Sequence, residues 1–171
     1  MLTKINKLNS NFYQHFRRSF QIRENDSNVD YTLTVRLPRG SENGIYIDLP
    51  EIKKASGYIQ SDLSIASPPK DCDAIIVDCD KEVVYLIEMK RTSKASTNTH
   101  LNEQLCAGAK WWEHIEFCID SQSIQEVKRI AVMVEERRSR SRAKKDLRNQ
   151  QDNGYGFYKF LGNSLSLDRV I

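Results

Sequence analysis

Two apolar runs joined by a short polar turn constrain the fold of this chain more than any other feature. The first run is Asp73-Ala-Ile-Ile-Val-Asp78, and the second is Val83-Val-Tyr-Leu-Ile-Glu-Met-Lys90; Cys79-Asp-Lys-Glu82 separates them. Short runs of β-branched and aliphatic residues on either side of a polar turn are typical of adjacent antiparallel strands. The sequence therefore predicts a β-hairpin over residues 73–90.

The second strand of this hairpin ends in two charges that share a face. Side chains alternate across a strand, so one face carries Val84, Leu86, Glu88 and Lys90, and the other carries Val83, Tyr85, Ile87 and Met89. Charges at the end of a mostly buried strand are costly unless they are paired, solvated at a cleft or bound to a metal. The pattern predicts polar chemistry at this end of the hairpin.

An acid at the start of the first strand gives Glu88 a chemical partner. The Glu-x-Lys spacing occurs three times, beginning at Glu51, Glu88 and Glu126, but only Glu88 closes an apolar strand that has an acid, Asp73, at the start of its partner strand. Two carboxylates can hold a hard divalent cation, with a backbone carbonyl and water completing the shell. A nearby ammonium such as that of Lys90 can then orient an attacking water and stabilise developing charge.

These residues resemble the motif of the PD-(D/E)xK nuclease superfamily, in which a proline and an acid near the start of one strand are followed by acid-x-lysine on the next. This chain has Pro69-Lys-Asp71-Cys-Asp73 and then Glu88-Met-Lys90. No aspartate directly follows the proline, so the first acid corresponds to Asp71 or Asp73. We favour Asp73 because it directly precedes the apolar run, and Asp71 is then a turn residue.

The resemblance implies a restriction-endonuclease-like α/β core, with a central mixed β-sheet flanked by helices. It implies an endonuclease that depends on Mg²⁺, with Mn²⁺ as a substitute, and that hydrolyses phosphodiester bonds in DNA. The implied ligands are Asp73, Glu88 and the backbone carbonyl of Met89, with Lys90 assisting the water. A homodimer would allow cleavage of both DNA strands.

Further site residues follow from the resemblance with less support from the sequence. Some members add an acid from the first core helix, for which this chain offers four candidates: Glu24, Asp48, Glu51 and Asp62. Some branches use a glutamine on the helix that follows the lysine, and Gln104 occupies a similar place. The tyrosine of the Gln-x-x-x-Tyr pattern is absent because position 108 is Gly108. A surface or helix–helix hydrogen bond is the alternative role of Gln104.

The order of the remaining predicted elements agrees with such a core. A helix after Lys90 is predicted by an N-cap at Ser96 or Thr97 and by a helically spaced stripe at Leu101, Leu105, Gly108, Trp112 and Ile115. Strands are predicted at residues 130–134 and 155–160, and a hairpin from strands at 29–37 and 45–49. An amino-terminal helix is predicted by the stripe of Ile5, Leu8, Phe12, Phe16 and Phe20.

Length and composition fit one domain. The chain has 171 residues, of which 39% are hydrophobic, so it can bury a substantial core as a single nuclease-like domain whose motif core spans about 68–134. No apolar stretch has the length of a membrane span or the form of a secretion signal, so we expect a soluble, intracellular (cytoplasmic) protein without membrane association. The four cysteines lack paired spacing and are expected to be free thiols.

Positive charge is concentrated in residues 137–148. This segment holds seven basic residues and one acid, for a local balance of +6, so the rest of the chain carries −3 of the net +3. Such a run is often only a solvated face, but beside a nuclease-like core we expect it to contact phosphates. The basic residues are Arg137, Arg138, Arg140, Arg142, Lys144, Lys145 and Arg148.

Two other functions remain open at this level. The chain could be a nonenzymatic nucleic-acid-binding or assembly module of the same fold, in which Asp73, Glu88 and Lys90 form a salt-bridge cluster. It could also be an RNA-cleaving nuclease, which substrate preference would separate from a deoxyribonuclease.

Overall fold

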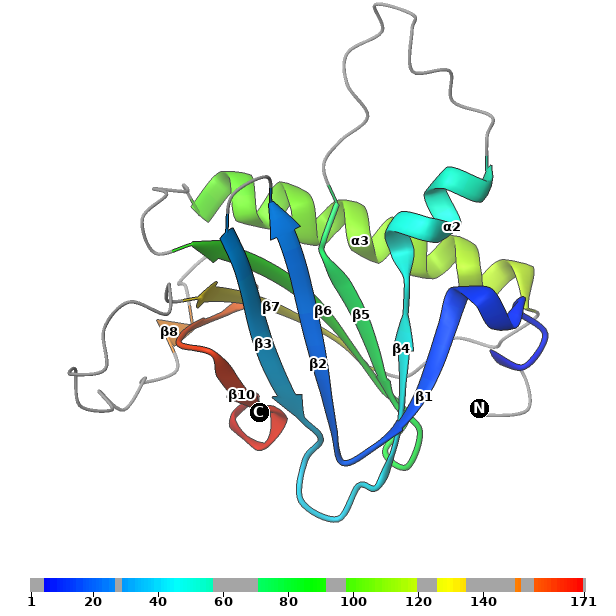
Figure 1. Cartoon of the computed structure of the whole chain (residues 1–171), viewed down its shortest axis with the longest axis horizontal. Coiled ribbons are helices and arrows are strands. Elements are labelled where there is room, and N and C mark those ends of the chain that lie inside the picture. The colour runs from blue at the N-terminus through cyan, green and yellow to red at the C-terminus, as the bar shows by residue number, and fades with distance from the viewer. Residues whose placement is uncertain are drawn as a thin grey trace, which may run out of the picture.

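The computed structural model describes residues 5–26, 29–56, 71–91, 98–119, 126–134, 150–151 and 156–170. The elements are η1 (Ser10–Phe12), β1 (Tyr13–Arg17), β2 (Ser19–Asp26), β3 (Val29–Arg36), β4 (Asn43–Ile47), α2 (Leu49–Ser56), β5 (Ala74–Asp78), β6 (Val83–Arg91), α3 (Asn98–Cys118), β7 (Glu126–Val134), β8 (Gln150–Gln151), β9 (Tyr158–Leu161), β10 (Ser164–Ser166) and η2 (Leu167–Arg169). A seven-stranded sheet has the order β1-β4-β5-β6-β7-β9-β8, and a three-stranded sheet has the order β10-β3-β2 (Figure 1).

The large sheet is mixed. From β1 to β6 its neighbours are antiparallel, whereas β6, β7 and β9 are mutually parallel and β8 is antiparallel to β9. The pairing therefore changes from antiparallel to parallel at β6, which has an antiparallel partner on one side and a parallel partner on the other. The structure confirms the predicted α/β class with a central mixed sheet.

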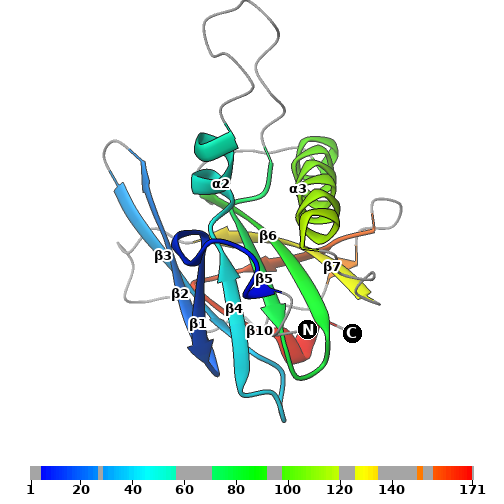
Figure 2. The same ribbon diagram turned by 90° about the vertical axis from the view of Figure 1, so that its right-hand side faces the viewer.

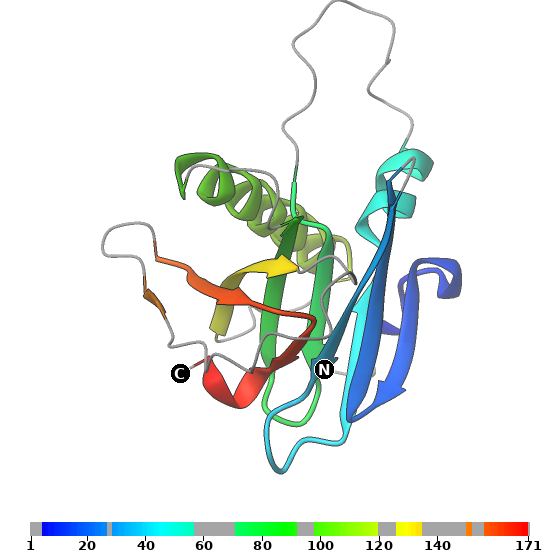
Figure 3. The same ribbon diagram turned by 60° about the vertical axis from the view of Figure 1, so that its left-hand side comes forward.

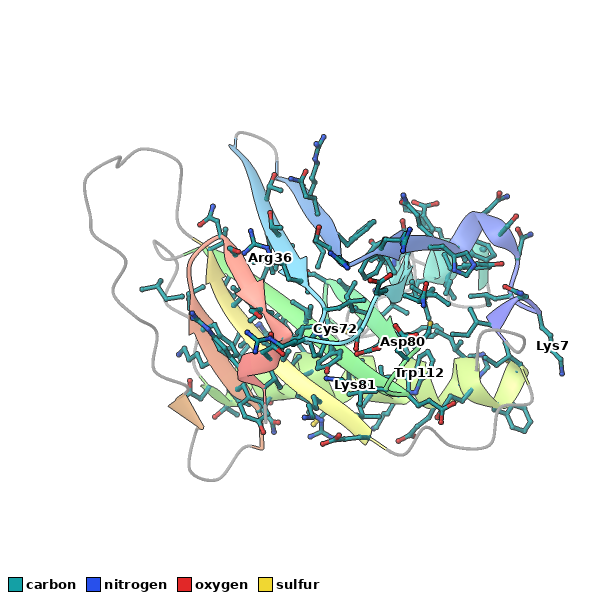
Figure 4. All side chains as sticks on the ribbon, turned by 90° about the horizontal axis from the view of Figure 1, so that it is seen from below. Lys7, Arg36, Cys72, Asp80, Lys81 and Trp112 are labelled. Atoms are coloured by element: carbon teal, nitrogen blue, oxygen red, sulfur yellow. The ribbon has the colours of Figure 1, made fainter. Side chains whose placement is uncertain are left out.

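The predicted hairpin of β5 and β6 is confirmed, and Asp78 organises its turn. The Oδ1 atom of Asp78 accepts hydrogen bonds from the backbone amides of Asp80, at 3.0 Å, and Lys81, at 3.2 Å. Glu82 closes the turn in the left-handed region, with φ of 56°. Figure 4 views the molecule from this end of the hairpin, with Asp80 and Lys81 labelled. The turn thus lies at the opposite end of the strands from Asp73 and Glu88.

The predicted helix after Lys90 is α3, and its predicted apolar stripe is buried against the sheet. Leu101, Leu105, Gly108, Trp112 and Ile115 are all buried, and the helix contacts β6 and β7. Because α3 connects two parallel strands, it runs back antiparallel to them, and its first turn lies at their carboxyl ends. Helices α2 and α3 lie on the same side of the large sheet (Figure 2).

The small sheet covers the other face of the large sheet. Ile22, Leu33 and Leu165 of the small sheet share one apolar cluster with Ile87 and Met89 of β6. Figure 3 shows the strands of the small sheet beside the large sheet. The helices α2 and α3 therefore flank the large sheet on one face, and the small sheet, with η2, covers the other. The expectation of a sheet flanked by helices holds for the α3 face alone.

Two predictions in the amino-terminal half are wrong. The expected helix through Phe12, Phe16 and Phe20 is a 3₁₀ turn followed by β1 and β2, between which Arg18 adopts a positive φ of 58°. The strands expected at 29–37 and 45–49 exist as β3 and β4, but they do not form a hairpin, because β3 pairs with β2 and β10 while β4 pairs with β1 and β5. The chain passes from one sheet to the other between them.

Two differences concern the later strands. Glu126 and Lys128, which we expected to precede the strand at 130–134, lie within β7. The aromatic strand expected at 155–160 begins at Tyr158, as β9.

Candidate active site

Asp73 lies opposite Glu88 at the open end of the β5–β6 hairpin. The strand register pairs Ala74 with Ile87, so continuing it by one residue sets Asp73 against Glu88. The Oδ2 atom of Asp73 accepts a hydrogen bond of 2.6 Å from the backbone amide of Met89. This bond fixes the aspartate carboxylate beside the Glu88–Met89 peptide, as the predicted pairing of the two acids requires.

Glu88 and Lys90 form an ion pair on the α3 face. Glu88 is fully buried, and its Oε1 atom pairs with the Lys90 ammonium, whose side chain is 23% exposed. A buried carboxylate is costly without a counter-charge, and Lys90 supplies one at the rim of the core. The prediction that these two side chains share a face is confirmed, since Val84 and Leu86 lie in the α3-side cluster.

Met89 presents its backbone to the site and its side chain to the opposite core. The side chain is buried in the cluster beneath the small sheet. In a strand, the N–H and C=O groups of one residue point to the same side. Because the Met89 amide reaches Asp73, its carbonyl also faces the side on which β5 has ended. A carbonyl oxygen is thus directed toward the region beside the two acids.

Three carboxylates act on one buried thiol, which shows how closely negative charge gathers here. Burial raises the pKa of Cys72 well above its usual value, and the negative charges of Asp73, Asp71 and Glu88 raise it further. The negative charge of these acids therefore disfavours a thiolate at Cys72.

Gln104 is buried beneath α3 with an unsatisfied oxygen. The residue is only 3% exposed, and its Oε1 atom has no hydrogen-bond partner within the described part of the chain. A buried amide oxygen without a partner carries a desolvation cost. The alternative that Gln104 makes a surface hydrogen bond is therefore wrong. Its Oε1 atom is left to accept a hydrogen bond or to coordinate a metal ion.

Gly108 allows α3 to approach the segment that leads into Asp73. A Cβ atom at position 108 would lie 2.3 Å from the Sγ atom of Cys72, which is labelled in Figure 4. Only glycine fits there without a shift of the helix or the segment. The close contact with Cys72 thus explains why position 108 holds glycine and not the tyrosine of the Gln-x-x-x-Tyr pattern.

The other acids considered as first or auxiliary ligands have different partners. Asp71 pairs with Lys53 of α2, with 2.6 Å between Oδ1 and Nζ. Asp48 caps α2 by accepting a 3.1 Å hydrogen bond from the Glu51 amide, and Glu51 pairs with Lys54. The side chain of Glu24 and all of Asp62 lie outside the described residues.

The donor set has the chemistry of a hard divalent cation. Within the described ranges no three or more His, Cys, Asp or Glu side chains converge as a metal-binding group. The set that the sequence motif implies has two carboxylates, Asp73 and Glu88, and the Met89 carbonyl. Oxygen donors of this kind suit Mg²⁺, which keeps several waters and takes few protein ligands. The residues present therefore fit the ion that the sequence motif implies.

Several sequence predictions fall on residues that are not described. The basic segment 137–148, Pro69 and the expected N-caps at Ser96 and Thr97 lie outside the described residues. All four cysteines are free. No helix in the described ranges is long and apolar enough to cross a membrane.

Comparison of the chain with protein-family models, curated proteins and solved structures gives no match.

Proposed function

We propose that this chain is a divalent-metal-dependent endonuclease that hydrolyses phosphodiester bonds, with DNA as the favoured substrate. The observation that carries the proposal is the hydrogen bond from the Met89 amide that holds the Asp73 carboxylate beside the Glu88–Met89 peptide, with Lys90 paired to Glu88. Two acids and a lysine at one sheet edge match the PD-(D/E)xK motif in type and order. The preference for DNA over RNA comes from that resemblance.

Asp73, Glu88 and the Met89 carbonyl would hold Mg²⁺, and Mn²⁺ could replace it. A bound ion of this kind supplies Lewis acidity and lowers the pKa of water. The hydrogen bond from the Met89 amide keeps the Asp73 carboxylate oriented toward the site. Gln104 would offer its Oε1 atom to the ligand shell or to an ordered water.

Lys90 would position the attacking water and stabilise the negative charge that develops on the phosphate. Its ammonium is held at the rim of the site by Glu88 and remains partly exposed to solvent. If Glu88 also bound a metal ion, its ion pair with Lys90 would weaken. The Lys90 ammonium could then donate hydrogen bonds to water and phosphate oxygens. The ion pair with Glu88 would thus hold the Lys90 side chain in position before substrate binds.

The basic segment would add phosphate contacts at the same edge of the sheet. Val134, the last residue of β7, pairs with Arg91, which directly follows Lys90. Arg137 follows Val134 by three residues in the sequence. The described part of β7 therefore ends beside the strand end that carries Lys90.

A nonenzymatic nucleic-acid-binding module is the second candidate, and the Lys90–Glu88 ion pair favours it. A salt bridge of this kind is what a purely structural cluster would contain. Metal titration separates the two functions. A catalytic pair of acids binds Mn²⁺, and the binding is lost in Glu88→Gln, whereas a structural cluster gives no specific response.

The decisive experiment is cleavage of a panel of linear, supercoiled, branched and single-stranded DNA and of RNA, with Mg²⁺, Mn²⁺ or EDTA. Wild type is compared with Lys90→Ala and with Lys81→Ala, which removes an exposed lysine at the opposite end of the hairpin. We expect metal-dependent cutting that falls at least about a hundredfold in Lys90→Ala, as for loss of a group that stabilises transition-state charge, and is unchanged in Lys81→Ala. Equal cutting by all three proteins would contradict the proposal.

A further inference from the structure

A second lysine, Lys159, lies in the same row of the sheet as Glu88. Glu88 of β6 pairs with Ala131 of β7, and Ala131 pairs with Lys159 of β9. Residues that pair across a sheet point to the same face. Ala131 belongs to the cluster on the α3 face, so Lys159 faces that side as well. Ala131, with its small side chain, lies between Glu88 and Lys159. The Cα atoms of these two charged residues are about 10 Å apart at ordinary strand spacing.

Lys159 has a neutral partner in place of a counter-ion. Its Nζ atom donates a 3.1 Å hydrogen bond to Oδ1 of Asn98, the first residue of α3, and the contact is partly buried. Among the described residues no carboxylate pairs with this ammonium. Lys128, also partly buried on β7, has Glu126 at 3.4 Å. Lys159 is thus held in place while its charge is left uncompensated.

The first turn of α3 adds positive rather than negative potential beside Lys159. The first turn of α3 contains no acidic residue, and the sequence has none between Glu88 and Glu103. The amino end of a helix carries partial positive charge, so a cation is unfavourable there and an anion is favourable. A partly buried ammonium at this position is stabilised only when an anion joins it.

We propose that Lys159 binds a backbone phosphate of the nucleic-acid strand, next to the phosphate that is cleaved. The inference rests on the proposed function for the identity of the anion. An ammonium recognises phosphate as a point charge, and the distance from Glu88 separates Lys159 from the reacting group. Lys159 is therefore a substrate-binding residue, whereas Lys90 acts at the reaction itself.

The test measures binding without cleavage. Fluorescent duplex DNA, and single-stranded DNA of the same sequence, are titrated with protein in EDTA and in Ca²⁺ over a range of salt concentrations. Lys159→Gln removes the charge and keeps a polar side chain, Lys159→Arg keeps the charge, and Lys81→Gln is the matched control. Lys159→Gln should bind about tenfold more weakly, as expected for loss of a charged hydrogen bond.

The salt dependence identifies the lost contact as a phosphate contact. The slope of log K against log salt should fall in magnitude by about one for Lys159→Gln on duplex DNA. Lys159→Arg should restore most of the slope, and Lys81→Gln should leave it unchanged. Wild-type affinity and slope in Lys159→Gln would overturn the proposal.

A second variant keeps the lysine and neutralises it. Asn98→Asp places a carboxylate beside Nζ and at the amino end of α3, where an acid stabilises the helix. We expect this protein to melt at or above the wild-type temperature and to bind DNA more weakly. A stable Asn98→Asp protein with wild-type affinity would contradict the proposal independently of how well Lys159→Gln folds.

The outcomes separate this inference from the proposed hydrolysis. If no metal supports cutting but Lys159→Gln loses affinity, the phosphate-binding role stands and the hydrolytic function fails. If cutting depends on Lys90 while both variants bind as wild type does, the hydrolytic function stands and the role of Lys159 fails.

Discussion

Gly108 of α3 lies against Cys72, so closely that a Cβ atom at position 108 would be 2.3 Å from Sγ. The contact sets the distance between the helix and the segment that carries Asp73. It also joins the packing of the core to the geometry of the candidate site, because Cys72 directly precedes the aspartate.

Gly108→Ala should therefore destabilise the protein by about 1–3 kcal/mol, the usual cost of forcing an extra methyl group into a packed core. The gain in helix propensity from alanine offsets only part of this cost. Urea denaturation of wild type and variant measures the change.

A double variant locates the cause of that loss. Cys72→Ala removes the Sγ atom, so Gly108→Ala should cost less in the Cys72→Ala background than in wild type. Equal costs in both backgrounds would show that the Cys72 contact is not the source of the destabilisation.

Asp73 and Asp71 should respond differently to the same change. Asp73→Asn keeps an oxygen to accept the Met89 amide but removes the charge, so we expect loss of Mn²⁺ binding and at least about a hundredfold slower cleavage. Asp71→Asn weakens the ion pair with Lys53 and should leave both properties near wild type. Calorimetric titration with Mn²⁺ and a cleavage assay test the pair, and the reverse order would assign the first ligand to Asp71.

Gln104→Met should stabilise the fold and impair the site. The change replaces a buried, unsatisfied amide oxygen with an apolar group of similar volume, so the melting temperature should rise with a gain of about 1 kcal/mol. Cleavage should fall if the oxygen serves the ligand shell. Gln14→Met, at an exposed position on β1, is the control. A stabilised Gln104→Met protein with full activity would remove Gln104 from the site.

Cys79 should make stability depend on pH in the alkaline range. Burial, with the charges of Asp78 and Asp80, raises the pKa of the Cys79 thiol to about 11. The folded state then holds its proton more tightly than the unfolded state, whose thiol titrates near about 8.5. The contribution to stability is complete below the unfolded pKa and is lost as pH rises toward the folded one.

The comparison needed is between wild type and Cys79→Ala. The free energy of unfolding of wild type should fall more steeply from about pH 8 to about pH 11. Cys118→Ala, at an exposed cysteine, should follow the wild-type curve. Parallel curves for wild type and Cys79→Ala would contradict the assignment.

The sequence predicted those elements whose apolar residues follow the spacing of only one type of secondary structure. These are the β5–β6 hairpin, α3 and the core of β7, each of which has a buried apolar run or stripe. The amino-terminal stripe misled because a spacing of four is also a multiple of two. Phe12, Phe16 and Phe20 would share a face in a helix and also in one strand. They lie instead in η1, β1 and β2, because β1 pairs with β4 and β2 pairs with β3.

The site was predictable only where its residues are close in sequence. Asp73, Glu88 and Lys90 belong to one hairpin, so alternation and register were enough to bring them together. Lys159 joins the row through two further pairings, with Ala131 between. The sequence around it shows only an aromatic strand and gives no sign of its neighbours.

The pairing of β3 with β10 has a consequence for synthesis. Thr34 lies beside Ser164, so the small sheet takes its third strand from near the opposite end of the chain. A ribosome releases β2, β3 and the whole β5–β6 hairpin long before residues 164–166 emerge. Until then one edge of β3 is open and the apolar face beneath it is incompletely covered. The small sheet would therefore be completed only after β10 has been synthesised.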